Sequence, residues 1–263
     1  MTNCWRSSEE PTGKWDELVI TMKVDIHYGD GIASLNIPDA NLGRGIRPWQ
    51  DEARADGAIR HFAGLPRAMA GPDAKRFQAE TVGRRLCVLL DDATRDEPFG
   101  PIFGQLFALL RKSSFVQFLI CTGTHEPDTP GNGKIKEQIA KAARAAGIDK
   151  FAIHVHDCEH DNFIRAGATA RGTEIIYNAL ADQADVFLAL SDVKVHYFAG
   201  YSNPIKNFVP GICAFATAEQ NHSLALDERS TFGVHPWHQN HARRNNPLAE
   251  DQLEGMRLIV KDR

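Results

Sequence analysis

The sequence predicts an α/β fold, a doubly wound, Rossmann-like sheet of parallel strands preceded by a short N-terminal β-hairpin. Apolar runs at residues 86–90 and 115–121 flank an amphipathic stretch at residues 99–112. Strand, helix and strand of these lengths make a βαβ unit, in which the two strands run parallel. Apolar runs within residues 150–157 and 185–192 continue the alternation. The repeated pattern therefore favours one parallel sheet covered by helices.

The N-terminal part of the chain is expected to add a hairpin to this sheet protein. Residues 1–21 contain no apolar core and are predicted to be a disordered leader, and residues 22–263 are predicted to form the folded domain. Residues 21–38 hold two short apolar segments around Gly29-Asp30-Gly31. Two apolar segments joined by such a turn are typical of a β-hairpin.

Two further stretches are predicted to be helical. Residues 49–80 are polar and rich in alanine, with breaks expected at the Gly and Pro residues of 64–66 and 71–72. A second amphipathic stretch covers residues 134–147. It ends at Gly147, a residue that readily adopts the left-handed conformation that closes many helices.

Composition favours a small-molecule partner in the cytoplasm. The 30 basic residues are balanced by 34 acidic ones, so no basic excess points to nucleic acid. No run approaches the ~20 apolar residues that cross a bilayer, so no membrane association is expected. The five cysteines are scattered without a C-x-x-C pair, which indicates reduced thiols rather than a disulfide framework.

Polar residues that could take part in binding or catalysis follow three of the predicted strands. Asp92, Thr94 and Arg95 follow the first strand, His125 follows the second, and His196 follows the strand at 185–192. In doubly wound sheets, ligands bind at the carboxyl ends of the strands, where the loops vary and helix N-termini converge. These residues therefore predict a binding site at that edge.

Each of these side chains has a chemical and a structural interpretation. An imidazole such as His125 titrates near neutrality and can exchange protons, or it can cap the following helix. Arg95 suits a carboxylate or phosphate oriented beside Asp92, although Asp92 or Thr94 could instead cap a helix. Lys206 lies in a loop punctuated by Gly and Pro, which favours a nucleophilic or tethering role over that of a solvated surface lysine.

Two other histidine clusters have spacings that suggest metal ligands. Residues 154–160 read His-Val-His-Asp-Cys-Glu-His, which resembles the metal-binding loop of binuclear zinc hydrolases in a different order. Residues 235–241 contain three histidines that one helical face could present, although Pro236 favours a helix start there. A zinc-dependent hydrolase is therefore an alternative function.

The order of the motifs resembles that of the lactate racemase family. The resemblance runs from Lys23 to Arg263 and depends on Asp-Asp-Ala-Thr-Arg at 91–95, Gly-Thr-His at 123–125, His-Tyr-Phe-Ala-Gly-Tyr-Ser at 196–202, Lys206 with Pro210-Gly211, and Asn221-His222. His196 and Lys206 are ten positions apart, and Lys206 and His222 are sixteen apart, as expected for that family.

The resemblance implies a nickel-pincer nucleotide as cofactor and racemisation or epimerisation of a small, lactate-like 2-hydroxyacid by hydride transfer. It also implies a dependence on the proteins that make the cofactor. The resemblance implies that Lys206 holds the cofactor, that His222 is a nickel ligand, and that His125 and His196 are the two acid/base histidines. It also implies that Arg95 lies near the substrate and that Asp92 and Thr94 lie at the cofactor.

The chain departs from the family pattern at two places. Asn203-Pro204-Ile205 replaces the glycines and basic residue that often precede the lysine, which changes backbone freedom next to Lys206. The family's C-terminal domain is also expected to be absent. The sequence therefore leaves open a non-catalytic cofactor-binding module, a fragment, or a partner half on another polypeptide, and it identifies neither the specific hydroxyacid nor the oligomeric state.

Overall fold

The structure is a computed structural model that describes residues 21–28, 31–41, 65–95 and 100–261. The chain divides into two compact units, residues 1–56 and residues 57–263, and each is described by itself. The expected leader lies outside the described residues, apart from Thr21 at the start of the first strand. The predicted helical stretch likewise lies outside them as far as residue 64.

The first unit contains the predicted hairpin. Strands β1 (Thr21–Tyr28) and β2 (Gly31–Pro38) pair antiparallel, from Thr21 opposite Pro38 to Tyr28 opposite Gly31. A short 3-10 helix, η1 (Asp39–Asn41), follows β2. The hairpin prediction is therefore confirmed for both strands, and residues 29–30 of the expected turn lie outside the described residues.

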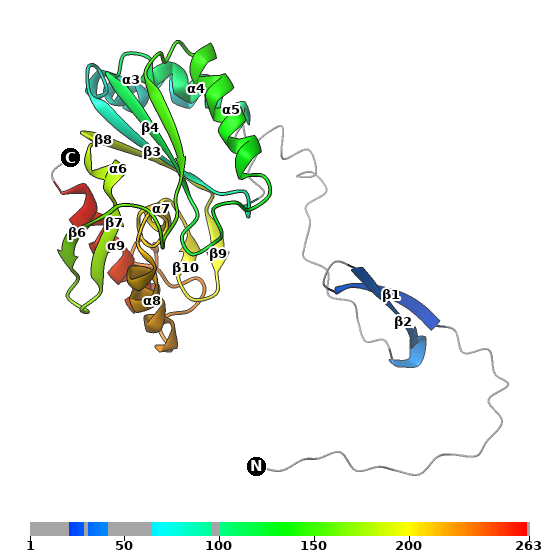
Figure 1. The fold of residues 1–263 in the computed structure, drawn as a ribbon. Coiled ribbons are helices and arrows are strands. Elements are labelled where there is room, and N and C mark those ends of the chain that lie inside the picture. The colour runs from blue at the N-terminus through cyan, green and yellow to red at the C-terminus, as the bar shows by residue number, and fades with distance from the viewer. Residues whose placement is uncertain (1–20, 29–30, 42–64, 96–99, 262–263) are drawn as a thin grey trace, which may run out of the picture. The chain divides into compact units, whose positions relative to one another are not determined.

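The second unit is built on a four-stranded parallel sheet in the order β5-β4-β3-β8 (Figure 1). Its strands are β3 (Arg85–Asp91), β4 (Phe115–Cys121), β5 (Phe151–Val155) and β8 (Val186–Leu190). Strand β3 pairs with β4 on one side and with β8 on the other. Because chain connections diverge from β3 in this way, a crevice is expected beyond its carboxyl end.

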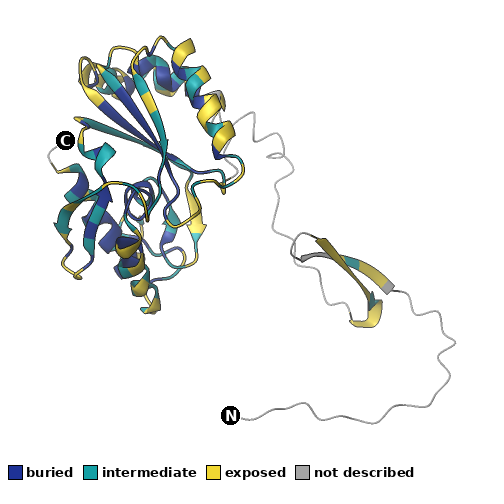
Figure 2. Ribbon diagram, viewed as in Figure 1, coloured by how far each residue is buried: buried dark blue, intermediate teal, exposed yellow. Residues whose placement is uncertain are grey.

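The two central strands, β3 and β4, are buried over most of their length and are the dark strands in Figure 2. On one face, Val88 and Phe118 pack with helices α3 (Pro72–Glu80), α4 (Gly100–Leu110) and α5 (Asn132–Ala145). Side chains alternate along a strand, so the neighbouring residues face the opposite side. There Leu89 and Leu119 pack with segments from the C-terminal half of the chain. The α/β prediction with a parallel sheet is confirmed.

The C-terminal half supplies elements that the sequence patterns did not predict. An antiparallel pair, β6 (Phe163–Ala168) and β7 (Glu174–Asn178), covers the second face together with helix α9 (Pro247–Val260) (Figure 1). The other short elements are α2 (Leu65–Met69), α6 (Ala179–Asp182), β9 (Lys194–His196), β10 (Gly200–Ser202), α7 (Ile205–Phe208), α8 (Phe215–Ser223), η3 (Leu224–Leu226) and η4 (His241–Arg243).

Helix boundaries agree with several of the local signals. Helix α5 is followed by Gly147 at φ +74°, whose N–H donates to the carbonyl of Arg144, as the predicted cap requires. Pro72 stands at the start of α3, where its missing N–H costs nothing. Within the described ranges, no helix is long and apolar enough to cross a membrane.

Candidate active site

A cavity of about 490 Å³ lies at the carboxyl end of the parallel sheet. Its walls come from the segments after β3 and β4, from the β9–β10 hairpin, and from α7 and α8. Six of the residues singled out in the sequence line it: Asp92, Arg95, His125, His196, Lys206 and His222. Strand-end position predicted that Asp92, Arg95, His125 and His196 lie at this edge, whereas Lys206 and His222 were expected from the family resemblance.

Asp92 and His125 form a hydrogen-bonded pair at one side of the cavity. Asp92 is only 2% exposed, and its Oδ2 lies 3.0 Å from Nδ1 of His125. A carboxylate oxygen accepts hydrogen bonds, so Nδ1 carries the hydrogen and Nε2 is left as the basic nitrogen. Thr94 donates from Oγ1 to the other oxygen of Asp92 at 2.6 Å. Asp92 and Thr94 thus orient the imidazole.

The helix-capping interpretations of these residues are not supported. Both oxygens of Asp92 contact side chains rather than backbone N–H groups, and Thr94 uses its hydroxyl on Asp92. The backbone N–H of His125 closes a turn onto the carbonyl of Thr122 rather than starting a helix. The turn 122–125 serves to present the ring to the cavity.

His196 ends strand β9 and is held by an aromatic cluster. Its ring stacks on Tyr197, with centroids 4.8 Å apart, and meets Phe198 edge-on at 4.6 Å. The backbone N–H of Ala199 donates to Nδ1 at 3.2 Å, so the neutral ring carries its hydrogen on Nε2. Burial, followed by the charges of Lys206 and Arg95, lowers the pKa of His196 to about 4.

Lys206 lies in the one-turn helix α7 rather than in the loop that the sequence predicted. The side-chain oxygen of Asn203 accepts from the N–H of Ile205 at 2.8 Å and starts the turn. The Asn-Pro-Ile sequence before the lysine therefore makes a helix start, where the family pattern has flexible glycines. Burial and the nearby guanidinium of Arg95 lower the pKa of Lys206 to about 8.

His222 reaches the cavity from helix α8. Its ring meets the ring of Phe198 edge-on, with centroids 5.2 Å apart. Burial, with a smaller contribution from the charge of Lys206, lowers the pKa of His222. A neutral imidazole is the form that binds a metal ion.

Two glycines allow the cavity walls to approach each other. The N–H of Gly123 donates to the carbonyl of Gly211 at 3.1 Å, which joins the His125 turn to the segment after α7. Gly123 has φ +60°, a conformation that suits glycine. A Cβ on Gly211 would lie 2.4 Å from the carbonyl oxygen of Asn207, so any larger residue would displace the backbone that carries Lys206.

Asn207, Tyr197 and Phe198 also line the cavity, and sequence reasoning missed all three as site residues. The amide nitrogen of Asn207 donates to the carbonyl of Leu190 at 3.2 Å, whereas its buried Oδ1 meets no donor among the described residues. Their positions directly beside His196 and Lys206 in the sequence were the available signal.

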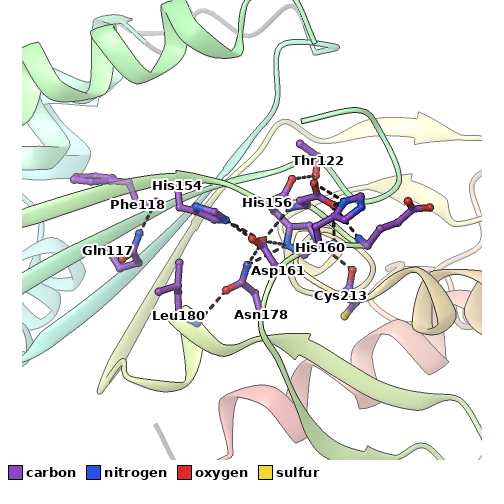
Figure 3. Close-up of polar contacts among 12 residues, drawn as sticks. Gln117, Phe118, Thr122, His154, His156, His160, Asp161, Asn178, Leu180 and Cys213 are labelled. Carbon is purple, nitrogen blue, oxygen red and sulfur yellow. Dashed lines mark hydrogen bonds and ion pairs between the residues drawn. The ribbon is translucent and has the colours of Figure 1, made fainter. Parts of the chain in front are cut away.

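The histidines at 154–160 form hydrogen-bonded pairs rather than a metal site (Figure 3). Asp161 accepts from Nε2 of His154 at 2.7 Å, and His160 pairs with Asp157 at 3.1 Å. His156 is fully buried and contacts a backbone carbonyl. Over the described residues, no three His, Cys, Asp or Glu side chains are arranged to hold a metal ion. The zinc-hydrolase alternative therefore loses its basis.

The predicted helical face at residues 235–241 is also wrong. The chain makes turns there, and the 3-10 helix η4 begins only at His241. His235 is buried and accepts from the N–H of Trp237 at 3.2 Å. Nδ1 of His238 accepts from the N–H of Asn240 at 2.9 Å, so local backbone contacts use these rings.

Comparisons with known proteins agree with this arrangement. Residues 28–233 match the family model described as lactate racemase N-terminal domain. The chain is 26% identical over 236 residues to the lactate racemase of Thermoanaerobacterium thermosaccharolyticum, covering 88% of this chain and 52% of that protein. It is 27% identical over 143 residues to the lactate racemase of Lactiplantibacillus plantarum, covering 52% of this chain and 32% of that protein.

A solved structure shows the same fold. The lactate racemase apoprotein from Thermoanaerobacterium thermosaccharolyticum aligns with a TM-score of 0.64 at 25% sequence identity, over 91% of this chain and 54% of that one. The chain thus spans about half the length of this relative. Because the family model matches well over half of the sequence, the chain belongs to the lactate racemase N-terminal domain family.

Proposed function

We propose that this chain binds a nickel-pincer nucleotide and takes part in the racemisation or epimerisation of a lactate-like 2-hydroxyacid. The observation that carries the proposal is the gathering of two histidine bases, a depressed-pKa lysine and a third histidine around one cavity at the sheet edge. Membership of the lactate racemase N-terminal domain family supports the same interpretation.

The residues at the cavity fit such a cofactor. Lys206 offers an amine with a pKa of about 8, so a useful fraction is uncharged near neutrality and can form a covalent bond. His222 offers an imidazole nitrogen, a suitable fourth ligand for square-planar nickel. Asn207 also lines the cavity, and its buried Oδ1 is an acceptor that meets no donor among the described residues. When bound, the nickel-pincer nucleotide would supply the acceptor for the hydride that leaves C2 of the substrate.

Two bases are needed because racemisation must approach both faces of one carbon. In our proposal, Nε2 of His125 takes the hydroxyl proton of one enantiomer. His196 does the same for its mirror image after its hydrogen shifts to Nδ1, which replaces the 3.2 Å contact from the Ala199 N–H and leaves Nε2 as the base. Each returns a proton to the oxygen when the hydride comes back. Asp92 fixes the tautomer and the orientation of His125, since its carboxylate accepts from Nδ1 at 3.0 Å.

Arg95 is the group that we propose holds the substrate carboxylate. It lines the cavity, and it is close enough to His196 and Lys206 to lower the pKa of each. A guanidinium binds a carboxylate through two parallel hydrogen bonds, which fixes the orientation of C2. The same carboxylate would offset the repulsion among the cavity's basic groups.

The decisive experiment is an intact-mass spectrum of the chain produced together with the cofactor-making proteins, followed by a racemisation assay. We expect an adduct that maps to Lys206, together with nickel in an amount equal to that of the adduct. The adduct should be absent from the Lys206→Met variant. Interconversion of D- and L-hydroxyacid would then establish the activity. A nickel-bearing chain without any turnover would indicate a cofactor-binding module, and a chain that acquires neither adduct nor nickel would contradict the proposal.

A further inference from the structure

We infer that His156 is a positioning residue that sets the spacing between the turn bearing His125 and the segment bearing Lys206. His156 is fully buried behind the cavity wall and does not line the cavity. It directly follows β5, and its contacts reach both of those segments (Figure 3). The inference rests on the proposed function for its effect on catalysis, although its structural part can be tested separately.

The first contact is with the turn 122–125. The N–H of His156 donates to the carbonyl of Ile120 at 3.0 Å, and its own carbonyl accepts from Oγ1 of Thr122 at 2.7 Å. These bonds extend the pairing of β4 with β5 beyond the last strand residues. The backbone of His156 therefore holds the start of the turn that presents His125.

The second contact is with the segment after α7. Nε2 of His156 lies 2.9 Å from the carbonyl oxygen of Cys213. Cys213 is held back onto the cavity wall, because its N–H donates to the carbonyl of Pro210 at 2.8 Å. The N–H of Gly211 in turn donates to the carbonyl of Lys206 at 2.8 Å. Three consecutive short contacts thus connect the imidazole to the lysine.

The surrounding groups fix the orientation of the His156 ring. A carbonyl can only accept, so Nε2 carries a hydrogen. Nδ1 lies 3.2 Å from the amide nitrogen of Asn178 and 3.3 Å from Oδ2 of Asp161, and the same amide donates to that carboxylate at 2.6 Å. His154 contacts both oxygens of the carboxylate, at 2.7 and 2.9 Å. The ring is therefore held in one orientation by partners that do not touch the cavity.

His156 therefore connects the turn that bears His125 to the segment that bears Lys206. The hydrogen bond from the N–H of Gly123 to the carbonyl of Gly211 joins the same two segments directly. His156 lies behind the cavity wall and reinforces this connection. Hydride and proton transfer depend on reacting atoms held close to their contact distance, and a displacement of about 1 Å can cost ~100-fold in rate. Loss of the His156 contacts is expected to affect the chemical step more than substrate binding.

The test compares three variants of the full chain. His156→Ala removes the contact with Cys213, His156→Gln keeps an amide donor of similar reach, and His154→Ala disturbs the same carboxylate without touching either cavity segment. We expect kcat to fall about 30-fold in His156→Ala with KM and nickel content within about twofold of wild type. We expect His156→Gln to recover most of that loss and His154→Ala to remain near wild type.

A second measurement does not depend on turnover. Amide hydrogen exchange at Gly123, followed by NMR in the cofactor-free chain, reports whether the bond to Gly211 opens more often. We expect exchange at least tenfold faster in His156→Ala, and unchanged in His154→Ala. Equal effects of the two alanine variants on exchange, or a Gln variant as impaired as Ala although equally folded, would overturn the inference. Inactive wild-type protein with the expected exchange pattern would contradict only the proposed function.

Discussion

Two groups of histidines in this protein have opposite surroundings. His125, His196 and His222 face a cavity beside a lysine and an arginine, whereas His154 and His156 are enclosed by carboxylate, amide and carbonyl partners. In the cavity, burial and like charges lower the pKa of His196 to about 4. Around His154 and His156, the partly buried carboxylate of Asp161 lies 2.7 and 3.3 Å from the rings. Unbalanced charge next to open space indicates a binding site, and a completed hydrogen-bond network indicates a structural role.

The largest expected difference between the two groups is in turnover. Replacing His125 or His196 by alanine is expected to reduce racemisation by about 10³-fold, because each removes a proton-transfer group. Nickel content is expected to stay unchanged in both variants, since neither residue is proposed as a ligand. Assays of hydroxyacid racemisation with metal analysis check this. Loss of nickel from both would contradict the assigned roles.

Lys206→Met is expected to stabilise the cofactor-free chain. Burial lowers the lysine pKa from 10.5 to about 8, so at pH 7 the native state holds an unfavourable charge worth up to about 3 kcal/mol. That cost is fully present below pH 8, and it disappears as the pH rises through 8 towards 10.5, where the native lysine loses its proton first. Urea unfolding at pH 7 and pH 11 measures the difference.

The exposed Lys150 supplies the matched control for that experiment. Lys150→Met is expected to change the free energy of unfolding by less than about 0.5 kcal/mol at either pH. If Lys206→Met destabilised the chain at pH 7, the lysine would be paired with an anion rather than exposed to repulsion. The contrast between the cavity and the closed network would then no longer hold.

In the closed network, the opposite outcome is expected. Asp161→Asn replaces an acceptor of three hydrogen bonds and should destabilise the chain by about 2 kcal/mol at pH 7. The histidine and backbone hydrogen bonds lower the pKa of Asp161 below its ordinary value of 3.8, against the effect of burial. Its stabilisation is therefore present at neutral pH and lost as the pH falls below that value. Unfolding at pH 7 and pH 3 should show the difference shrinking.

The smallest expected effect is a change in titration. In the cofactor-free chain, the His196 ring should titrate near pH 4, and Lys206→Met should raise that midpoint, because the lysine charge is the second largest cause of the shift. Imidazole NMR signals followed between pH 3 and pH 8 measure it. A midpoint near 6.5 in both proteins would show that the ring is hydrated, and the proposed crowding of charge would be wrong.

The parts of the fold that depend on local pattern could be predicted from the sequence. The hairpin, the βαβ unit and the helix ending at Gly147 each follow from periodicity and turn residues a few positions apart. The β6–β7 pair was missed because the alternation in these segments is broken, with a register shift between Arg165 and Gly167. Such irregular pairs are stabilised by packing under α9, which sequence periodicity does not record.

The candidate site divides in the same way. Strand-end position and motif order identified His125, His196 and Lys206, since each follows a recognisable run. Asp92 was identified as well, but its contact with His125 could not be predicted, because the two residues are 33 positions apart. The contact of His156 with Cys213, across 57 positions, was missed for the same reason. Only the completed sheet brings these residues together.

The strand order also has a consequence for biogenesis. The pairing of strand β3 is complete only after β8 has been synthesised, because Leu86 pairs with Val186. The last of the described cavity residues, His222, comes later still in the chain. During synthesis, the βαβ unit can form long before the pocket exists, and a nascent chain lacking α8 presents no complete binding surface. Under the proposed function, a cofactor would be loaded only after α8 has folded, when the cavity is complete.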